Sequence, residues 1–184
     1  MNGRNSAAKR SVGALFVILM LHASQPVFAV SVGRCGGTGG ASTKTLTCPA
    51  GQYVVGIYGR GGGFLDSFGI RCAPIAKDGK RGAVGGLMTG GGTGGTVSRD
   101  GICSGDRAVF ALRFKSGIYV DNAMAGGCRG KDERSVGTPA AVSLNVGGPG
   151  GINCATSCAA EEWMTSVKIR YGGWVESIES FCSP

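Results

Sequence analysis

Histidine is almost absent from this chain, since its 184 residues include only one, His22. This residue lies within the segment 1–29, whose pattern predicts removal during export. The remaining chain would then have no imidazole for general-base catalysis, proton transfer or metal ligation. This absence weighs against most hydrolase mechanisms, and the sequence calls for no metal and no cofactor.

The sequence also lacks an apolar run long enough to serve comfortably as a membrane anchor. Three basic residues precede a short apolar run, Val12 to Leu21, and Val27-Phe28-Ala29 offers small residues at a cleavage site. This order is typical of a secretory signal peptide at residues 1–29, and an uncleaved anchor is the less favoured alternative. We therefore expect a secreted or periplasmic protein that begins near Val30 and does not insert into a membrane after cleavage. Its 155 residues (184 − 29) suit a single domain, 30–184.

Concentrated positive charge is missing as well. The exported part keeps 16 of the 19 basic residues and all 11 acidic ones, so its net charge is 16 − 11 = +5. These basic residues are scattered and form no tract. The electrostatic footprint of a nucleic-acid binder is therefore weak, and no nucleic-acid partner is expected.

Cysteine, by contrast, is plentiful. All eight cysteines lie in the predicted exported part, and an even number in an oxidising compartment favours disulfides over a free catalytic thiol. Cys154 and Cys158 could suggest a metal-binding pair, but the missing histidine disfavours it. The eight are Cys35, Cys48, Cys72, Cys103, Cys128, Cys154, Cys158 and Cys182.

The sequence repeats with a fixed period. Cys48 and Cys103 are separated by one such period, and Cys103 and Cys158 are separated by the same number of residues. Three series show this period to within one residue: Cys48, Cys103 and Cys158; Asp66, Asp121 and Glu176; Cys72, Cys128 and Cys182. A fixed period of this length is the signature of a fold built from repeated supersecondary units. The sequence therefore predicts three repeats, at about 33–87, 88–142 and 143–184.

Glycine-rich segments follow nearly the same period. They are Gly36–Gly40, Gly91–Gly95 and, one residue later in register, Gly147–Gly151. Glycines this regular are typical of positions where the backbone needs a positive φ or approaches another group closely.

No segment with a convincing helical period competes with the strand-like runs. These runs are rich in β-branched and aromatic residues, as in Tyr53–Tyr58, Phe68–Cys72, Ala108–Phe114 and Trp163–Arg170. Glu161-Glu162 could open a helix, but the matching segments of the other repeats favour a strand. The sequence predicts an all-β fold of hairpins joined by Gly-rich turns.

If each repeat closes a hairpin with cysteines at its outer ends, the natural pairs lie within repeats, which leaves Cys35 with Cys154. This connectivity is a hypothesis, and the within-repeat pairs are Cys48–Cys72, Cys103–Cys128 and Cys158–Cys182. Three small sheets must bury their apolar faces against one another, and a three-sided prism with pseudo-threefold symmetry does so. The charged stretches 77–81 and 129–134 then connect sheets in solvent.

Two segments resemble the jacalin-related lectins. Residues 59–70 (GRGGGFLDSFGI) resemble their Gly-x-x-x-Asp loop and following strand, and residues 35–40 (CGGTGG) resemble their opening Gly-rich segment. The cysteine-bracketed threefold also resembles the vitelline membrane outer layer proteins. Together these resemblances cover the chain from about residue 33 to its end. They imply a β-prism I fold of three four-stranded Greek-key sheets, and for the lectins carbohydrate binding without metal.

The loop motif occurs three times in register, each time with an aromatic residue at its third position. A fixed carboxylate beside main-chain N–H groups can bind the hydroxyl pair of a hexose, while an aromatic ring covers its apolar face. The sugar-binding residues expected in these loops are Gly62, Phe64, Leu65, Asp66, Gly117, Tyr119, Val120, Asp121, Gly172, Trp174 and Glu176.

The resemblance further implies that a Gly-rich loop completes each site. Asp66 would lie beside Gly91–Gly95, Asp121 beside Gly147–Gly151, and Glu176 beside Gly36–Gly40. The third site departs from the pattern, because glutamate is one methylene longer than aspartate and its carboxylate is displaced. The glycines expected at the three sites are Gly92 and Gly94, Gly148 and Gly150, and Gly37 and Gly39.

Other interpretations stay open at this point. An aspartate after a Gly-rich turn often binds only its own loop, and aromatic residues at strand starts often belong to the core. The chain could be a structural or coat protein without a sugar ligand. An enzyme is disfavoured, because paired catalytic carboxylates must face one substrate within about 5 to 10 Å, whereas a threefold arrangement separates them. The identity of the sugar and the oligomeric state are not determined by the sequence.

Overall fold

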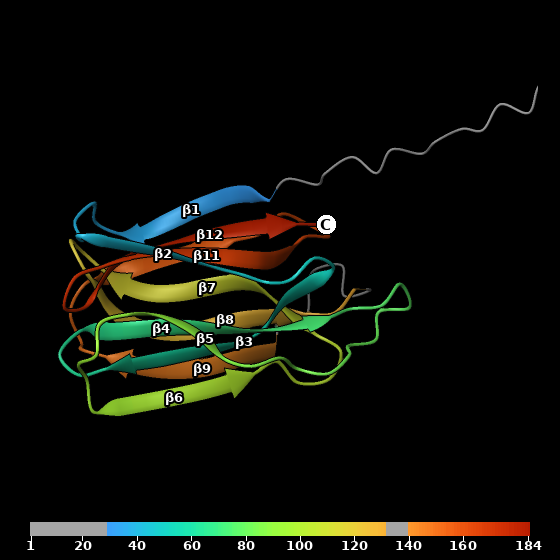
Figure 1. Ribbon diagram of the computed structural model, residues 1–184, viewed down its shortest axis with the longest axis horizontal. Helices are drawn as coiled ribbons and strands as arrows, with labels where there is room; N and C mark the ends of the chain where they lie inside the picture. The colour runs from blue at the N-terminus through green and yellow to red at the C-terminus, as the bar shows by residue number, and fades with distance from the viewer. Residues whose placement is uncertain (1–28, 132–139) are drawn as a thin grey trace, which may run out of the picture.

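A computed structural model describes residues 29–131 and 140–184, all of them in strands, turns or loops (Figure 1). No helix that could span a membrane occurs in these two ranges. The predicted signal peptide lies outside them except for its last residue. The strands are β1 (Val30–Gly36), β2 (Ser42–Thr47), β3 (Gln52–Gly61), β4 (Leu65–Pro74), β5 (Met88–Gly91), β6 (Val97–Ile102), β7 (Ala108–Ser116), β8 (Val120–Arg129), β9 (Ala140–Gly147), β10 (Ile152–Ser157), β11 (Trp163–Tyr171) and β12 (Val175–Ser183).

The twelve strands form three antiparallel four-stranded sheets. Their strand orders are β1-β12-β11-β2, β5-β4-β3-β6 and β10-β7-β8-β9. Each sheet has a central hairpin from one repeat, flanked by the first two strands of the next repeat; the amino-terminal pair β1 and β2 flanks the carboxyl-terminal hairpin. The repeats therefore interlock in a closed ring, as the loop pairs implied by the resemblance require.

Central and outer strands differ in composition because they differ in burial. The central strands β3 and β4 are buried at most positions on both faces and carry mainly Val, Ile, Phe, Leu and Gly. The outer strands β2 (STKTLT), β6 (VSRDGI) and β10 (INCATS) are largely exposed. This difference explains why the sequence indicated the central strands clearly and the outer ones weakly.

The inner faces of the three sheets share one core on the pseudo-threefold axis. Equivalent residues of the three hairpins meet there: Leu65, Val120 and Val175 have no exposed surface. Phe68 and Phe114 pack edge to face, with ring centroids 5.6 Å apart. A three-sided prism with a single core is thus the fold, as the sequence predicted.

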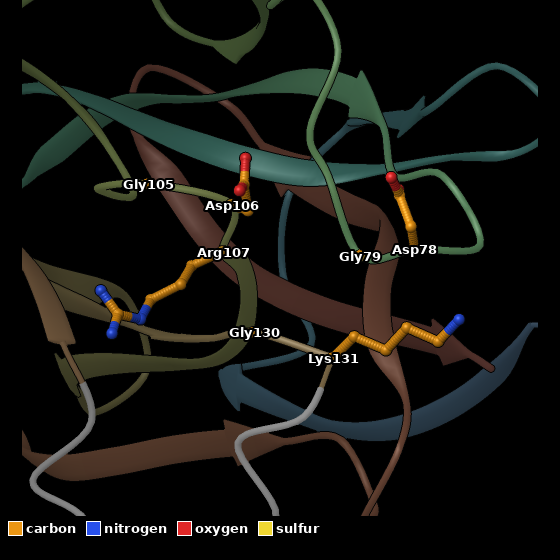
Figure 2. A pocket seen from close by; sticks show the side chains of 7 residues that line it. All are labelled: Asp78, Gly79, Gly105, Asp106, Arg107, Gly130 and Lys131. Atoms are coloured by element: carbon orange, nitrogen blue, oxygen red, sulfur yellow. The ribbon is translucent and has the colours of Figure 1, made fainter.

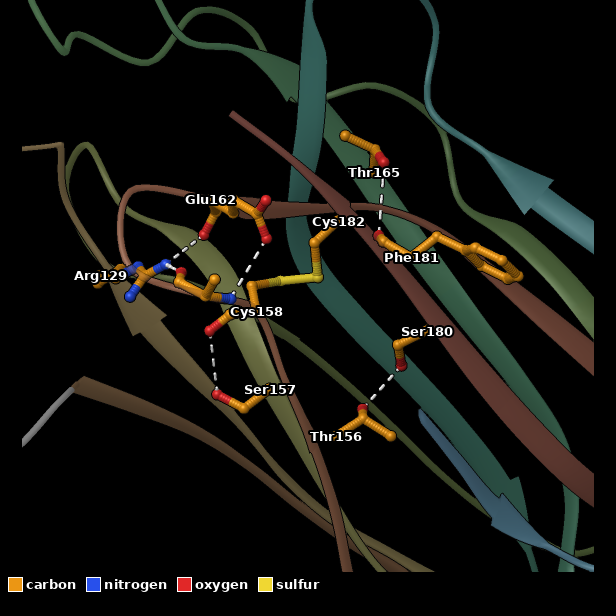
Figure 3. The surroundings of a disulfide bond; sticks show 10 residues. Arg129, Thr156, Ser157, Cys158, Glu162, Thr165, Ser180, Phe181 and Cys182 are labelled. Carbon is orange, nitrogen blue, oxygen red and sulfur yellow. Dashed lines mark hydrogen bonds between the residues drawn. A yellow bond between two sulfur atoms is a disulfide. The ribbon is translucent and has the colours of Figure 1, made fainter. Parts of the chain in front are cut away.

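The four predicted disulfides are all present, and no described cysteine is free. The reasoning behind them needs correction, because each bond joins two different sheets instead of closing a hairpin. Cys158, which follows β10, is bonded to Cys182 of β12 in the neighbouring sheet, with a sequence separation of 24 (Figure 3). Beside it, the Thr156 and Ser180 hydroxyls share a buried hydrogen bond of 2.8 Å between the same two sheets.

The charged stretch 77–81 lies in the connection between β4 and β5, and it is largely exposed as expected. In the other stretch, 129–131 end β8 and begin the next connection, and 132–134 lie outside the described residues. Residues 159–162 form a turn with Glu161 at φ 64°, so no helix begins there.

Candidate functional site

All three predicted acidic loops lie at one end of the prism, together with all three Gly-rich loops. This end is at the left of Figure 1, and the carboxyl terminus is at the right. Each acid is the second residue of the strand that follows a hairpin turn: Asp66 in β4, Asp121 in β8 and Glu176 in β12. The Gly-rich loops join β5 to β6, β9 to β10 and β1 to β2.

Each acid contacts the Gly-rich loop that was expected beside it. The main-chain carbonyl of Asp66 accepts a hydrogen bond of 2.7 Å from the Gly92 N–H. Gly148 donates in the same way to Asp121 (2.9 Å), and Gly37 donates to Glu176 (3.0 Å). The ring of three repeats therefore brings together the predicted loop pairs.

A second glycine of each loop lies against the carboxylate itself. A Cβ atom on Gly94, Gly150 or Gly39 would collide with a carboxylate oxygen of Asp66, Asp121 or Glu176, respectively. The last glycine of each loop has a positive φ, between 74° and 89°, that other residues rarely adopt. The side-chain oxygens are consequently flanked by bare main chain.

Three of the predicted binding glycines have a different task. The N–H groups of Gly37, Gly92 and Gly148 are already bonded to the acids' carbonyls, and a Cβ on these residues would collide with the hairpin turn of the neighbouring sheet. Their N–H groups are bonded within their own sheet and are not available to a sugar, and the missing Cβ lets the neighbouring sheet approach closely.

The hairpin turns also retain main-chain donors. The first N–H of each turn is used internally: Gly62 donates to the Phe64 carbonyl at 3.0 Å, and Gly117 and Gly172 do the same in their turns. Within residues 29–131 and 140–184, no acceptor is found for the next two N–H groups of each turn. They belong to Gly63 and Phe64, Ile118 and Tyr119, and Gly173 and Trp174.

The side chains of Leu65 and Val120 do not belong to the site. Both are completely buried in the core at the base of the turns. Strand alternation directs the residue before each acid inward. Leu65 and Val120 could therefore take part in a site only through their main chain, and that part of the prediction stays a prediction.

The three aromatic residues lie together rather than apart. The ring centroids of Phe64, Tyr119 and Trp174 form a triangle with sides of 5.3, 5.5 and 5.6 Å. Each ring was expected to serve its own loop, and the structure instead gathers one ring from each sheet. We call Phe64, Tyr119 and Trp174 the aromatic triad.

Sequence reasoning missed one cation at each loop. The Arg60 guanidinium donates to the Gly92 carbonyl at 2.9 Å, the Lys115 ammonium to the Pro149 carbonyl at 3.3 Å, and the Arg170 guanidinium to the Gly39 carbonyl at 2.8 Å. These cations brace the Gly-rich loops. Their regular spacing along the chain is the signal that could have identified them, since it equals the spacing of the acids.

The carboxylate of Asp66 is electrostatically perturbed. Partial burial raises the pKa of Asp66 above its ordinary value of 3.8, while the Arg60 charge and the nearby Gly62 main chain act in the opposite direction. Burial is the largest of these effects.

Two surface pockets lie at the opposite end of the prism. One, of about 370 Å³, is lined by residues of three connections, and Figure 2 shows Arg107 and Lys131 extending from it in opposite directions. The other, of about 430 Å³, includes Tyr53 and Trp163 in its lining. Neither pocket includes a predicted site residue, and no cluster of metal-ligating side chains occurs in the two described ranges.

No protein-family model and no curated protein sequence matches the chain. Solved structures do match it. Malaysian banana lectin superposes with a TM-score of 0.59 and 16% identity, over 85% of this chain and 99% of that one. A mannose-specific jacalin-related lectin from Morus nigra, solved with mannose, gives 0.59 and 14% over 85% and 95%. The mannose-binding lectin from Champedak gives 0.60 and 9% over 87% and 100%.

These similarities concern the fold, because the identities are low. Three four-stranded antiparallel sheets around one core, superposing on these lectins along nearly their whole length, are the β-prism I architecture. The chain has this fold, and four disulfides join its sheets.

Proposed function

We propose that this protein is a secreted lectin that binds hexoses without a metal ion, at the loops of Asp66 and Asp121 and, less favourably, of Glu176. The observation that carries the proposal is one arrangement present three times. At each loop a carboxylate lies against bare glycine main chain, next to turn N–H groups that have no acceptor among the described residues. A sugar edge offers adjacent hydroxyls that can donate to the carboxylate and accept from such N–H groups.

The fold supports the same proposal by analogy. Structures that share it include lectins solved in complex with mannose, with mannopentose and with a biantennary N-glycan. A shared fold does not determine function, so the loop chemistry has to carry the assignment. The four disulfides and the amino-terminal pattern support export to an oxidising compartment.

The arrangement also argues against catalysis. Each carboxylate belongs to a different sheet and lies against its own Gly-rich loop. Glycoside hydrolysis instead requires an acid and a second carboxylate that flank one scissile bond. We therefore assign binding and no turnover.

The test is calorimetric titration of the oxidised protein, residues 30–184, with glucose, galactose, mannose and N-acetylglucosamine. Binding should persist in EDTA. Replacing Asp66→Asn together with Asp121→Asn should weaken it more than tenfold, because hydrogen bonds to a charged group contribute about 1.5–3 kcal/mol each.

The matched control is Asp78→Asn, an exposed aspartate at the opposite end whose carboxylate oxygen accepts from the Lys80 N–H. It should bind as the unaltered protein does. Equal binding by the double variant would refute the site. Absence of binding to every sugar, with a specific protein partner captured instead, would favour a structural or coat function.

A further inference from the structure

Two residues of the aromatic triad are exposed, unlike most large apolar side chains of the molecule, and Tyr119 is half-buried. Phe64 and Trp174 are 36% and 38% exposed, whereas Phe68 and Phe114 in the core are at most 1% exposed. The Tyr119 ring stands nearly perpendicular to the other two, at 70° and 81°. The triad is therefore a compact aromatic surface, with rings from all three sheets, at the end of the prism.

Other exposed apolar side chains lie at the same end of the prism. Of the eight large apolar residues that are exposed in the described chain, five lie at this end. Besides Phe64 and Trp174 they are Ile118, Val97 and Ile152. Ile118 is 74% exposed and precedes Tyr119 in the chain, and the other two follow two of the Gly-rich loops. An apolar patch rimmed by polar groups is typical of a binding surface.

The triad is also close to all three acids. Each aromatic residue precedes its acid by two positions in the chain, so their Cα atoms are at most about 7 Å apart. The three acidic loops thus lie around one shared aromatic centre.

We propose that the aromatic triad and the three acidic loops form one composite site for a single oligosaccharide or polysaccharide chain. One sugar ring lies over the triad, and its linked neighbours bind at the Asp66 and Asp121 loops. This inference rests on the proposed function and specifies its ligand as a chain of linked hexoses and not an isolated one.

The rim of the site favours a glycan over other occupants. A hexose presents an apolar C–H face and a hydroxylated edge together, which matches rings beside carboxylates and unpaired N–H groups. An acyl chain would cover these polar groups without satisfying them, which is costly. A second copy of this end would bring the acids of two molecules together, while Arg60, Lys115 and Arg170 are already engaged with loop carbonyls.

The composite site predicts how chain length affects binding. A linear pentasaccharide of the hexose bound best in the calorimetric panel should bind at one chain per protein. Its affinity should exceed that of the monosaccharide by about tenfold or more, since linked sugars engage neighbouring contacts together. Trp174→Ala should weaken the pentasaccharide by about tenfold.

The matched control is Val84→Ala, an exposed apolar residue in the connection at the other end of the prism. It should change neither ligand's affinity. Trp174→Phe should restore most of the pentasaccharide affinity, because an aromatic face remains.

A second measurement uses the unaltered protein and needs no variant to fold. The chain has two tryptophans, of which Trp163 is only 7% exposed, so quenching of fluorescence by acrylamide reports chiefly on Trp174. Saturation with the pentasaccharide should reduce this quenching.

The outcomes separate this inference from the proposed function. Unchanged quenching, two or three chains bound per protein, or full pentasaccharide affinity in Trp174→Ala would overturn the composite site, while monosaccharide binding that depends on Asp66 and Asp121 would leave the lectin assignment standing. If neither ligand binds the unaltered protein, both proposals fail.

Discussion

At each loop, glycines of one short segment perform two different tasks. Gly94 leaves room beside the Asp66 carboxylate, whereas Gly92 leaves room for the turn of the neighbouring sheet at Gly173. The first task concerns a ligand site and the second concerns packing. Substitutions at the two positions should therefore separate binding from stability.

We expect Gly94→Ala to weaken sugar binding at the first loop while the protein stays folded. The added methyl group would displace only a carboxylate oxygen, the end of a flexible side chain, and Gly94 has no positive φ. Gly92→Ala would push against the main chain of Gly173 and should lower the free energy of unfolding by about 1–3 kcal/mol. Calorimetric titration and denaturant unfolding measure the two effects.

Gly86→Ala is the matched control, because a Cβ there meets nothing within 4 Å. It should alter neither binding nor stability. Normal sugar binding by Gly94→Ala at the first loop would contradict the assignment of that carboxylate.

Acidification should abolish binding at Asp66 earlier than expected for an ordinary aspartate. Burial raises the pKa of Asp66 above 3.8, so its carboxylate is protonated at a higher pH and ceases to accept two hydroxyl donors. Titration of affinity against pH in an Asp121→Asn, Glu176→Gln background isolates this loop. A midpoint at or below 3.8 would contradict the prediction.

The free energy of unfolding should depend on pH in the opposite direction to sugar binding at Asp66. The folded-state pKa is the higher one, so the folded protein binds more protons than the unfolded chain between the two pKa values, and stability falls as the pH rises through this window. Asp66→Asn should therefore be slightly more stable than the unaltered protein at neutral pH while its first loop no longer binds sugar. Thermal unfolding at pH 4 and pH 7 checks this trade-off.

At the scale of elements, the sequence predicted the structural features that recur with its fixed period. The central hairpins and the cysteine pairs follow that period, and the structure contains them. The partnership of each acid with one Gly-rich loop was implied by the resemblance to the jacalin-related lectins, and the structure contains it as well. The outer strands were not assigned, because exposed Ser, Thr and Lys residues leave no apolar alternation. The sequence also did not show which outer strands join which sheet, because the pairing of strands from different repeats is set by tertiary contacts.

The aromatic triad shows a second limit of sequence reasoning. One-dimensional spacing indicated that Phe64, Tyr119 and Trp174 are equivalent, and equivalence suggested three separate places. Equivalent residues close to a symmetry axis instead meet each other, and their distance from the axis cannot be read from a period. The burial of the Leu65 and Val120 side chains was not anticipated either, because the geometry of the turn decides which face of the sheet the next side chain occupies.

The disulfides should differ in what they contribute. The Cys35–Cys154 bond spans 119 residues and joins the first repeat to the third, whereas Cys48–Cys72 spans 24. On the chain-entropy model their contributions are about 5 and 3.5 kcal/mol, and the other bridges inside the longer loop reduce the difference to about 1 kcal/mol. We expect the Cys35→Ala, Cys154→Ala variant to be the less stable of the two double variants.

Denaturant unfolding of both variants under oxidising conditions measures this difference. Mass spectrometry of the peptides should first confirm that the remaining three bonds are unchanged. Equal stability, or a greater loss on removing Cys48–Cys72, would show that local packing and not loop length determines the contribution.

At the scale of the whole molecule, the three repeats form a closed ring, and the fold does not require the ends of the covalent chain to lie at one particular place in it. β1 pairs with β12, with Val30 opposite Cys182, so the two ends of the described chain lie at the same end of the prism. Every sheet combines strands of two repeats, and in the sheet that holds both ends of the described chain no loop joins the central hairpin to the outer strand β1. Hydrogen bonds and the Cys35–Cys154 bond close the ring there.

A circular permutant that begins at Leu87 and ends at Gly86, with a short Gly-Ser linker from Pro184 to Val30, should therefore fold. The cut lies in an exposed connection where a Cβ added at Gly86 would meet nothing within 4 Å, and such sites tolerate new termini. We expect the same four disulfides, a free energy of unfolding within about 2 kcal/mol and unchanged sugar binding. A second permutant, cut between Gly63 and Phe64, should lose much more stability and its sugar binding, because the cut opens a central hairpin at the aromatic triad. If the first permutant failed to fold while the second succeeded, the equivalence of the three repeats in the closed ring would be disproved.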